Sequence, residues 1–136
     1  MRDKIQAFLA GRPFAVAGAS ADRGKFGNKV LRCYLQHELP VSVVHPRAAA
    51  EPELRIEGVP AYAKLGDLPE VPHGLSIVTP PAVTEKLVEQ CIEAGVSYVW
   101  MQPGAESALA IEAAERAGLG VIHGGPCILV ELGFDG

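Results

Sequence analysis

The amino-acid sequence predicts an α/β fold, in which helices cover both faces of a mostly parallel sheet of about five strands. Short, nearly continuous apolar runs alternate with longer segments whose apolar residues recur at helical spacing. Most of the apolar runs end in glycine or proline, as strands do before a loop. The 136 residues contain no linker, internal repeat or low-complexity tract, so we expect one domain over residues 1–136.

The first third of the chain supplies two helices and two strands. Residues 2–10 predict a short amphipathic helix that ends before Gly11. Residues 14–19 are almost entirely apolar, which favours a strand covered on both faces. A second helix runs to about residue 38, and residues 41–45 form the second strand between two prolines.

The middle of the chain is less regular. Residues 47–58 show little apolar periodicity and are predicted as a loop, which leads into the short segment 59–62. Residues 65–68 predict one helical turn, and residues 75–78 predict the third main strand.

The remaining elements complete the alternation. A helix is expected to begin at Pro80 with Thr79 as its N-cap, and residues 98–101 form the fourth strand. Residues 106–117 predict an alanine-rich helix, and residues 121–123 lead into a tail that we expect to close the sheet. Strands that alternate with helices imply parallel strands joined by right-handed crossovers, as in a Rossmann-like three-layer fold.

Composition excludes several classes of protein. A net charge of −4 argues against a nucleic-acid binder, which needs clustered lysine and arginine. Asp3, Arg12 and Pro13 interrupt what would have to be the apolar region of a signal peptide, so secretion is not expected. No run of about 18 apolar residues occurs, so membrane spanning is not expected either. The three cysteines are odd in number and lack a CxxC spacing, which predicts neither a disulfide framework nor a zinc site and favours the cytoplasm.

Ligands of an open parallel sheet bind beyond the carboxyl ends of its strands, where the strand order reverses. The first of these ends carries the stretch GASADRG, between a predicted strand and a predicted helix. Such a turn offers free backbone N–H groups and the positive end of a helix dipole, which suit a phosphate or pyrophosphate. Its glycines, Gly18, Gly24 and Gly27, do not have the dinucleotide spacing, and they could instead serve only a tight connection.

The second strand end separates the possible ligands. A fold that binds NAD expects an acid there for the ribose hydroxyls, but the sequence has His45, Pro46 and Arg47. Arg47 would suit a ribose phosphate, as in NADP or in coenzyme A with its 3′-phosphate. It could also be a solvated loop residue.

Candidate catalytic groups are few. His123 and Cys127 lie close in sequence, but no acid is placed beside them, and we predict no catalytic residue. Cys91, and by the same argument Cys33, falls on an apolar helix face and is expected in the core. His37 and His73 are expected on the surface, and the four histidines show no metal spacing.

Six short motifs occur together in one order: VAGAS, the interval from Gly18 to Gly24 followed by Phe26, HPR, VTPP, VWMQPG and GPCI. In this order they resemble the small stand-alone CoA-binding proteins. They are also similar to the N-terminal CoA-binding domains of the succinyl-CoA synthetase alpha subunit and of ADP-forming acyl-CoA synthetases. The resemblance covers residues 10–131.

The resemblance implies a place for each part of coenzyme A. The turn at residues 21–24 would lie along the diphosphate, Arg47 would contact the adenosine phosphate region, and residues 78–81 would border the adenine and ribose. Residues 101–104 would lie along the pantetheine arm, and residues 126–127 would lie near the thiol. The predicted ligand-binding residues are Gly18, Ala19, Ser20, Ala21, Asp22, Arg23, Gly24, His45, Pro46, Arg47, Thr79, Pro80, Met101, Gln102, Pro103, Gly104, Pro126 and Cys127.

The sequence departs from the family pattern in two places. The stand-alone proteins usually have Asp-Arg-Cys where this chain has Gly-Gly-Pro-Cys after His123, and the larger enzymes have the Cys-Pro pair in reversed order. The phospho-histidine of the synthetases belongs to a second domain, so His123 is not given that role and no ligase activity is expected.

The sequence therefore predicts a cytoplasmic protein that binds coenzyme A or an acyl-CoA without catalysis of its own, with a homo-oligomer or an unidentified protein as possible partner. Two alternatives stay open. One is a small NADP-binding oxidoreductase or a fragment of one, although the sequence has no Tyr-x-x-x-Lys pair. The other is a protein-interaction module that has kept the fold without the ligand.

Overall fold

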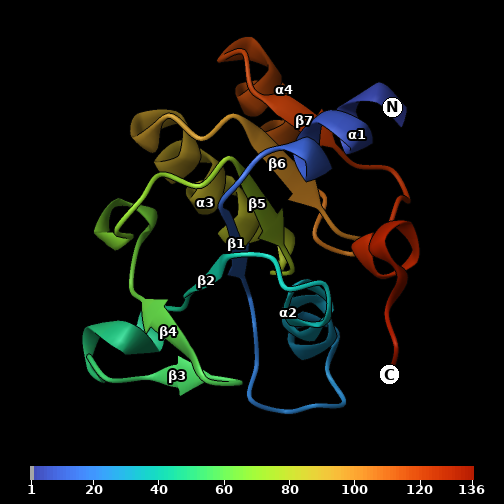
Figure 1. Ribbon diagram of the computed structural model, residues 1–136. Coiled ribbons are helices and arrows are strands. Elements are labelled where there is room, and N and C mark those ends of the chain that lie inside the picture. The colour runs from blue at the N-terminus through green and yellow to red at the C-terminus, as the bar shows by residue number, and fades with distance from the viewer. Residues whose placement is uncertain (1) are drawn as a thin grey trace.

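A computed structural model describes residues 2–136 and confirms the three-layer α/β fold (Figure 1). Seven strands form one sheet in the order β3-β4-β2-β1-β5-β6-β7. Six of them are parallel, and β3 is antiparallel to β4 at the edge. The strands are β1 (Phe14–Ala17), β2 (Val41–Val44), β3 (Arg55–Ile56), β4 (Val59–Tyr62), β5 (Gly74–Ile77), β6 (Tyr98–Met101) and β7 (Gly120–Ile122).

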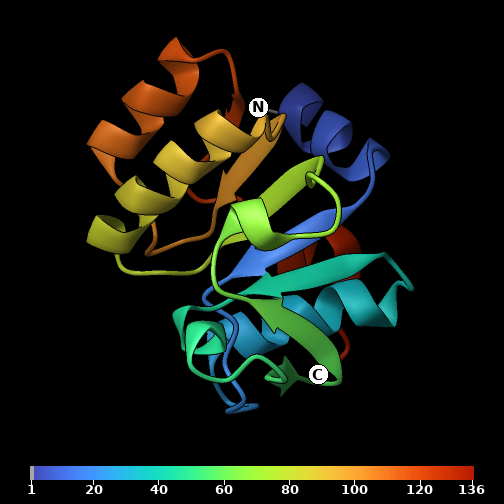
Figure 2. The same cartoon turned by 90° about the vertical axis from the view of Figure 1, so that its left-hand side faces the viewer.

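Helices cover both faces of the sheet, as the two groups of coils in Figure 2 show. Side chains of α1 and α2 pack in one core cluster with Phe14 and Val16 of β1. Side chains of α3 and α4 pack on the opposite face with Ala15 and Ala17, because neighbouring residues of a strand point to opposite faces. The helices are α1 (Arg2–Ala10), α2 (Phe26–Gln36), α3 (Pro81–Ala94) and α4 (Ala108–Arg116).

Aromatic side chains fill the core beneath α1 and α2. The Phe8 ring stacks on Phe14 at 5.4 Å between centroids and meets Trp100 edge to face at 5.2 Å. Tyr34 of α2 is fully buried, and its hydroxyl lies 2.7 Å from the Ser76 hydroxyl of β5. This hydrogen bond gives both buried hydroxyls a partner and fixes α2 against the centre of the sheet.

The order of the strands reverses between β1 and β5. From β1 the chain passes to β2 and β4 on one side, and it then returns to place β5, β6 and β7 on the other. The carboxyl ends of β1 and β5 therefore diverge into α2 and α3, and a ligand cleft is expected between these connections. Within residues 2–136 no helix is long and apolar enough to cross a membrane.

The middle of the chain differs from the prediction. Residues 47–58 are not only a loop, because they contain the 3₁₀ turn η1 (Pro46–Ala49) and the edge strand β3. The turn between β3 and β4 is made by Glu57 and Gly58, which both have positive φ (51° and 79°), as a two-residue hairpin turn requires. The sheet therefore has more strands than the expected five.

The third helix starts one residue later than expected. Pro80 is the N-cap and Pro81 is the first helical residue, and Thr79 is not the cap. The Thr79 hydroxyl lies 2.9 Å from the Thr84 hydroxyl instead, which leaves the start of α3 without a side-chain cap in the part of the chain that the structure describes.

The C-terminal tail does not add a strand to the sheet. It forms a π-helical turn, η3 (Leu129–Gly133), that packs on α2. The Gly133 carbonyl lies 2.7 Å from the His37 ring, and the Gln36 amide bonds with the backbone of Asp135. The positive φ of Gly124 and Gly125 turns the chain away from the sheet edge after β7.

The expected surface position of His73 was also wrong. This side chain is half-buried, its Nε2 lies 2.9 Å from the Ala7 carbonyl, and its ring packs on Tyr98. Its role is to join α1 to the start of β5. His37 is exposed, as predicted.

Candidate functional site

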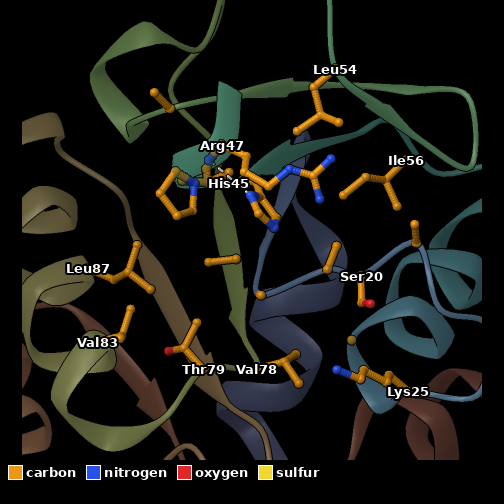
Figure 3. Close-up of a pocket in the computed structure, with 18 of the residues that line it drawn as sticks. Ser20, Lys25, His45, Arg47, Leu54, Ile56, Val78, Thr79, Val83 and Leu87 are labelled. Carbon is orange, nitrogen blue, oxygen red and sulfur yellow. Dashed lines mark hydrogen bonds between the residues drawn. The ribbon is translucent and has the colours of Figure 1, made fainter. Parts of the chain in front are cut away.

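A cleft of about 840 Å³ opens at the carboxyl ends of β1, β2 and β5 (Figure 3). Its walls are the loop after β1, the start of α2, η1, the β3–β4 hairpin and the first half of α3. In Figure 3, Arg47 of η1 and His45, which directly precedes η1, extend into the space, and Val83 and Leu87 of α3 line another side. The cleft thus occupies the position at which the strand order reverses.

Two glycines allow the loop after β1 to fold tightly. Gly18 has φ of +97°, and a Cβ there would lie 2.3 Å from the Val78 carbonyl oxygen. A Cβ on Gly27 would lie 2.1 Å from the Gly18 carbonyl oxygen. Gly24 has no such restriction, because its nearest contact would be at 3.4 Å. The close approach of β1, β5 and α2 therefore depends on Gly18 and Gly27.

Two side chains fold the loop on itself. The Ser20 hydroxyl accepts a hydrogen bond from the Asp22 amide at 3.1 Å, and the Asp22 carboxylate accepts one from the Gly24 amide at 2.9 Å. The Lys25 amide donates to the Asp22 carbonyl at 3.1 Å. The loop is therefore a series of local turns rather than an extended strap.

A polar network holds the same loop from outside the cleft. The Asn28 amide donates to the Ser20 carbonyl at 2.8 Å and to the Glu57 carboxylate at 3.1 Å. Glu57 also pairs with the Arg23 guanidinium at 3.0 Å. Arg32 donates to the Asn28 side-chain oxygen at 2.7 Å and to the Arg23 carbonyl at 3.0 Å.

The N-terminus of α2 faces the cleft without a cap. Lys25 occupies the N-cap position with extended backbone, and no side chain among residues 2–136 bonds to the first-turn amides. The first turn also contains no acid. Lys25, Phe26 and Gly27 all line the cleft, and the Lys25 ammonium points towards it in Figure 3. Unsatisfied helix amides and a positive dipole end therefore border the space, as in sites for phosphate.

The lining side chains carry charge of one sign. Four of them are basic, and none of the described residues that line the cleft is an acid. The basic residues are Lys25, Arg47, Arg55 and Lys86. Because the whole chain has a net charge of −4, this concentration of positive charge is local to the cleft and favours an anionic ligand.

Arg47 lies at the end of β2, where the sequence placed it. Its guanidinium is 3.1 Å from the Glu51 carboxylate, and both side chains are more than half exposed. An exposed pair of this kind is worth at most about 1 kcal/mol, so it does not prevent Arg47 from turning to a ligand phosphate.

His45 is a neutral hydrogen-bonding group of the cleft. Burial, and to a smaller extent the charge of Arg47, lowers the pKa of its imidazole below the ordinary value. The ring Nδ1 accepts a hydrogen bond from the Arg47 amide at 3.1 Å, so the ring proton of the neutral form resides on Nε2. His45 therefore offers a donor to the cleft.

The structure divides the predicted ligand residues into two groups. Half of them line the cleft: Gly18, Ala19, Ser20, Ala21, His45, Pro46, Arg47, Thr79 and Pro80. Asp22, Arg23 and Gly24 belong to the same loop but are not among the residues that line the cleft.

The second group lies at the ends of β6 and β7 and does not line this cleft. Met101 and Gln102 are fully buried, whereas Pro103 and Gly104 are exposed. The Gln102 side-chain oxygen accepts from the Ile128 amide at 3.0 Å, and its Nε2 has no hydrogen-bond partner among residues 2–136. Pro126 and Cys127 are half-buried, and the Trp100 indole donates to the Pro126 carbonyl at 3.0 Å.

Sequence reasoning named Lys25 as a possible phosphate donor, and Lys25 lines the cleft. It missed several other lining residues: Phe26, Gly27, Leu54, Arg55, Ile56, Val83, Lys86, Leu87 and Gln90. Val83, Lys86, Leu87 and Gln90 are spaced three or four residues apart, so they lie on neighbouring positions of one helix surface. The sequence contains this spacing. Leu54 and Ile56 had the alternation of a short strand, but two residues are too few to identify one.

Two of the three cysteines are buried thiols. Burial raises the pKa of the Cys33 thiol to about 11 and that of Cys91 to about 12, so both are protonated at neutral pH. All three cysteines are free, and Cys33 and Cys91 are in the core, as predicted. Within the described residues, no group of three His, Cys, Asp or Glu side chains could hold a metal ion.

Comparison with solved structures places the fold among small proteins of similar length. A conserved hypothetical protein from Pyrococcus furiosus is 34% identical, with a TM-score of 0.79, over 89% of this chain and 99% of its own. A protein from Thermus thermophilus is 26% identical, with a TM-score of 0.81, over 96% of both chains.

A larger enzyme contains the same fold as one part. The dinucleotide-forming acetyl-coenzyme A synthetase 1 of Candidatus Korarchaeum cryptofilum is 26% identical, with a TM-score of 0.68, over 81% of this chain and 25% of its own. No curated protein matches the sequence. Residues 12–133 match the family described as CoA binding domain, so the chain belongs to the CoA-binding domain family.

Proposed function

We propose that this protein binds coenzyme A or an acyl-CoA in the cleft between β1, β2 and β5, without catalysis of its own. The observation that carries the proposal is the combination of an uncapped helix N-terminus with four basic side chains and no lining acid among the described residues. Membership of the CoA-binding domain family supports the same ligand class. Coenzyme A brings a diphosphate and a 3′-phosphate, which match this charge.

Each part of the ligand has a counterpart in the proposed site. The diphosphate would lie along the turn at residues 21–24 and the amides at the start of α2. The 3′-phosphate would meet Arg47, and the adenine would lie between residues 78–81 and the apolar face of α3. The pantetheine arm would leave the cleft towards residues 101–104, with Pro126 and Cys127 near its thiol.

NADP is the nearest alternative ligand. The end of β2 carries Arg47 rather than an acid, and an arginine there also suits a 2′-phosphate. The two ligands differ in where the phosphate sits on the ribose and in the group attached to the far side of the diphosphate. Direct competition between them therefore decides which one the cleft prefers.

Arg47→Ala tests the assignment of the adenosine end. Charge-assisted hydrogen bonds are worth about 1.5–3 kcal/mol, so we expect the variant to bind CoA at least about tenfold more weakly than wild type. Dephospho-CoA, which lacks the 3′-phosphate, should bind both proteins equally. Titration calorimetry of both proteins with both ligands gives the comparison. Equal affinity of the wild type for CoA and dephospho-CoA would show that Arg47 does not recognise this phosphate.

We also propose a cytoplasmic location, supported by three free cysteines, which persist in a reducing compartment. A homo-oligomer or an unidentified protein partner remains part of the proposal.

A further inference from the structure

Glu57 lies at the tip of the β3–β4 hairpin, far in sequence from the loop after β1 but in contact with it. Its backbone has φ of +51°, a conformation that non-glycine residues seldom adopt. The neighbouring Ile56 is buried and lines the cleft, so the hairpin is fixed on its apolar side. The Glu57 carboxylate contacts the loop through Arg23, which lies 34 residues earlier in the chain.

Both carboxylate oxygens of Glu57 have a partner. Oε1 is 3.0 Å from the Arg23 guanidinium, and Oε2 is 3.1 Å from the Asn28 amide nitrogen. The Glu57 side chain is 19% exposed, so solvent screens it less than it screens Arg23, which is 63% exposed. Because an exposed partner contributes little by itself, the contact with buried Asn28 is the stronger link.

Asn28 transmits this link to the loop backbone. Its amide nitrogen has two hydrogens, which reach the Ser20 carbonyl and the Glu57 carboxylate, and its oxygen accepts from Arg32. Both N–H donors of the buried amide and one acceptor position of its oxygen are then in use, and this pattern determines which way the amide is turned. The Ser20 carbonyl is thereby held at one position, immediately before the turn proposed for the diphosphate.

We propose that Glu57 is a positioning residue for the diphosphate of the ligand. It holds Asn28 and Arg23 on the outer side of the loop, so that the amides of the turn are ordered before the ligand arrives. A site that is ordered in advance pays less conformational entropy on binding. This inference rests on the proposed function, since the diphosphate belongs to the proposed ligand.

The contact between Glu57 and Arg23 could also have the opposite effect on ligand affinity. If Arg23 were a direct ligand of the phosphate, Glu57 would compete with that phosphate for the guanidinium. Removal of the Glu57 charge would then strengthen binding, whereas loss of a positioning residue weakens it. The sign of the change therefore distinguishes the two roles.

Glu57→Gln is the decisive variant. Glutamine has nearly the same shape but accepts at only one of the two positions, and it turns an N–H₂ group towards the other donor. We expect CoA binding to weaken about tenfold, because the loop must then be ordered on binding. Binding of adenosine 3′-monophosphate, which has the adenine and 3′-phosphate but no diphosphate, should not change. Calorimetric titration and competition measure both ligands.

Two further variants serve as controls. Glu53→Gln removes the same charge from an exposed residue of the same segment, whose side chain makes no hydrogen bond or ion pair within residues 2–136, and should leave CoA binding unchanged. Arg23→Gln should weaken CoA binding only about twofold, since the exposed Arg23 is the weaker link. A tenfold loss in Arg23→Gln, together with tighter binding in Glu57→Gln, would overturn the positioning role. An equal loss for both ligands in Glu57→Gln would overturn it as well, because general destabilisation acts on every ligand.

Hydrogen exchange tests the loop without any ligand. In ligand-free Glu57→Gln, the amides of Asp22 and Gly24 should exchange at least about fivefold faster than in wild type, with Glu53→Gln unchanged. Unchanged exchange at these amides would contradict the positioning role. If wild-type protein fails to bind CoA, the proposed function fails, and the exchange result still decides whether Glu57 orders the loop.

Discussion

At the scale of single residues, the cleft combines groups that hold positive charge with groups that hold a shape. Arg47 and Lys25 supply charge, whereas Gly18 and Gly27 let β1, β5 and α2 approach within contact distance. His45 fixes the backbone and also faces the ligand space: its ring Nδ1 accepts from the Arg47 amide, and its Nε2–H remains a donor for the cleft. The chemistry of the site is that of anion binding by ordered donors.

The protonation of His45 should report on the ligand. Burial lowers its pKa in the folded protein, so the unfolded chain binds more protons near and below pH 6.5. Its contribution to stability is therefore complete above the unfolded pKa and is lost as the pH falls through about 6.5 towards the folded pKa. We expect an NMR titration of the ligand-free protein to place the His45 midpoint below 6.5, and CoA to raise it through the nearby phosphate charge. A ligand-free midpoint above 6.5 would contradict the burial argument.

At the scale of elements, the start of α2 borders the cleft without a side-chain cap among the described residues. Its N-cap residue, Lys25, has the extended backbone of a capping residue but makes no capping bond among residues 2–136. The α4 helix, which does not line the cleft, has Ser107 as N-cap, and the Ser107 hydroxyl accepts from the Ala110 amide at 3.3 Å. The starts of α2 and α3, whose residues line the cleft, thus lack a side-chain cap among residues 2–136, whereas α4 has one.

Lys25→Asp should separate stability from binding. An aspartate at the N-cap satisfies first-turn amides and complements the helix dipole, so the free energy of unfolding in urea should rise by about 1 kcal/mol. The same carboxylate would repel phosphates, and CoA binding should weaken at least about tenfold. Lys25→Ser caps without the negative charge, so it should show a smaller loss of CoA affinity. A variant that becomes more stable and binds CoA as well as wild type would show that this helix end does not face the ligand.

Periodicity and turn residues were enough to predict most of the elements. The strands around β1 and β5 are short apolar runs, and the helices between them have a clear apolar face. The strand β3 escaped prediction because Arg55 and Ile56 alone carry no periodicity. The tail escaped it because its packing on α2 depends on distant partners such as His37.

In the candidate site, too, local patterns could be predicted from the sequence and contacts between distant segments could not. Residues at the strand ends, such as Gly18, Arg47 and Thr79, were identified because the carboxyl ends of parallel strands meet at one edge of the sheet. Lys86 and Arg55 reach the cleft only through the packing of α3 and the hairpin. The link between Glu57 and the loop spans about 30 residues and leaves no local pattern in the sequence.

At the scale of the whole molecule, an acidic chain has a basic cleft at the carboxyl ends of its central strands. The acidic side chains that give the net charge of −4 lie outside the cleft lining. The electrostatic potential therefore favours an anion in the cleft rather than along an extended face of the molecule. Chain length and coverage agree with small relatives, whereas the acetyl-coenzyme A synthetase has the same fold as a quarter of a longer chain.

Calorimetric titration of the wild-type protein with CoA and with NADPH tests the central claim most directly. We expect saturable binding of one CoA per chain, at least about tenfold tighter than any binding of NADPH. The two ligands should compete, because both would place a diphosphate at the start of α2. Absence of heat with CoA, or tighter binding of NADPH, would contradict the proposed function.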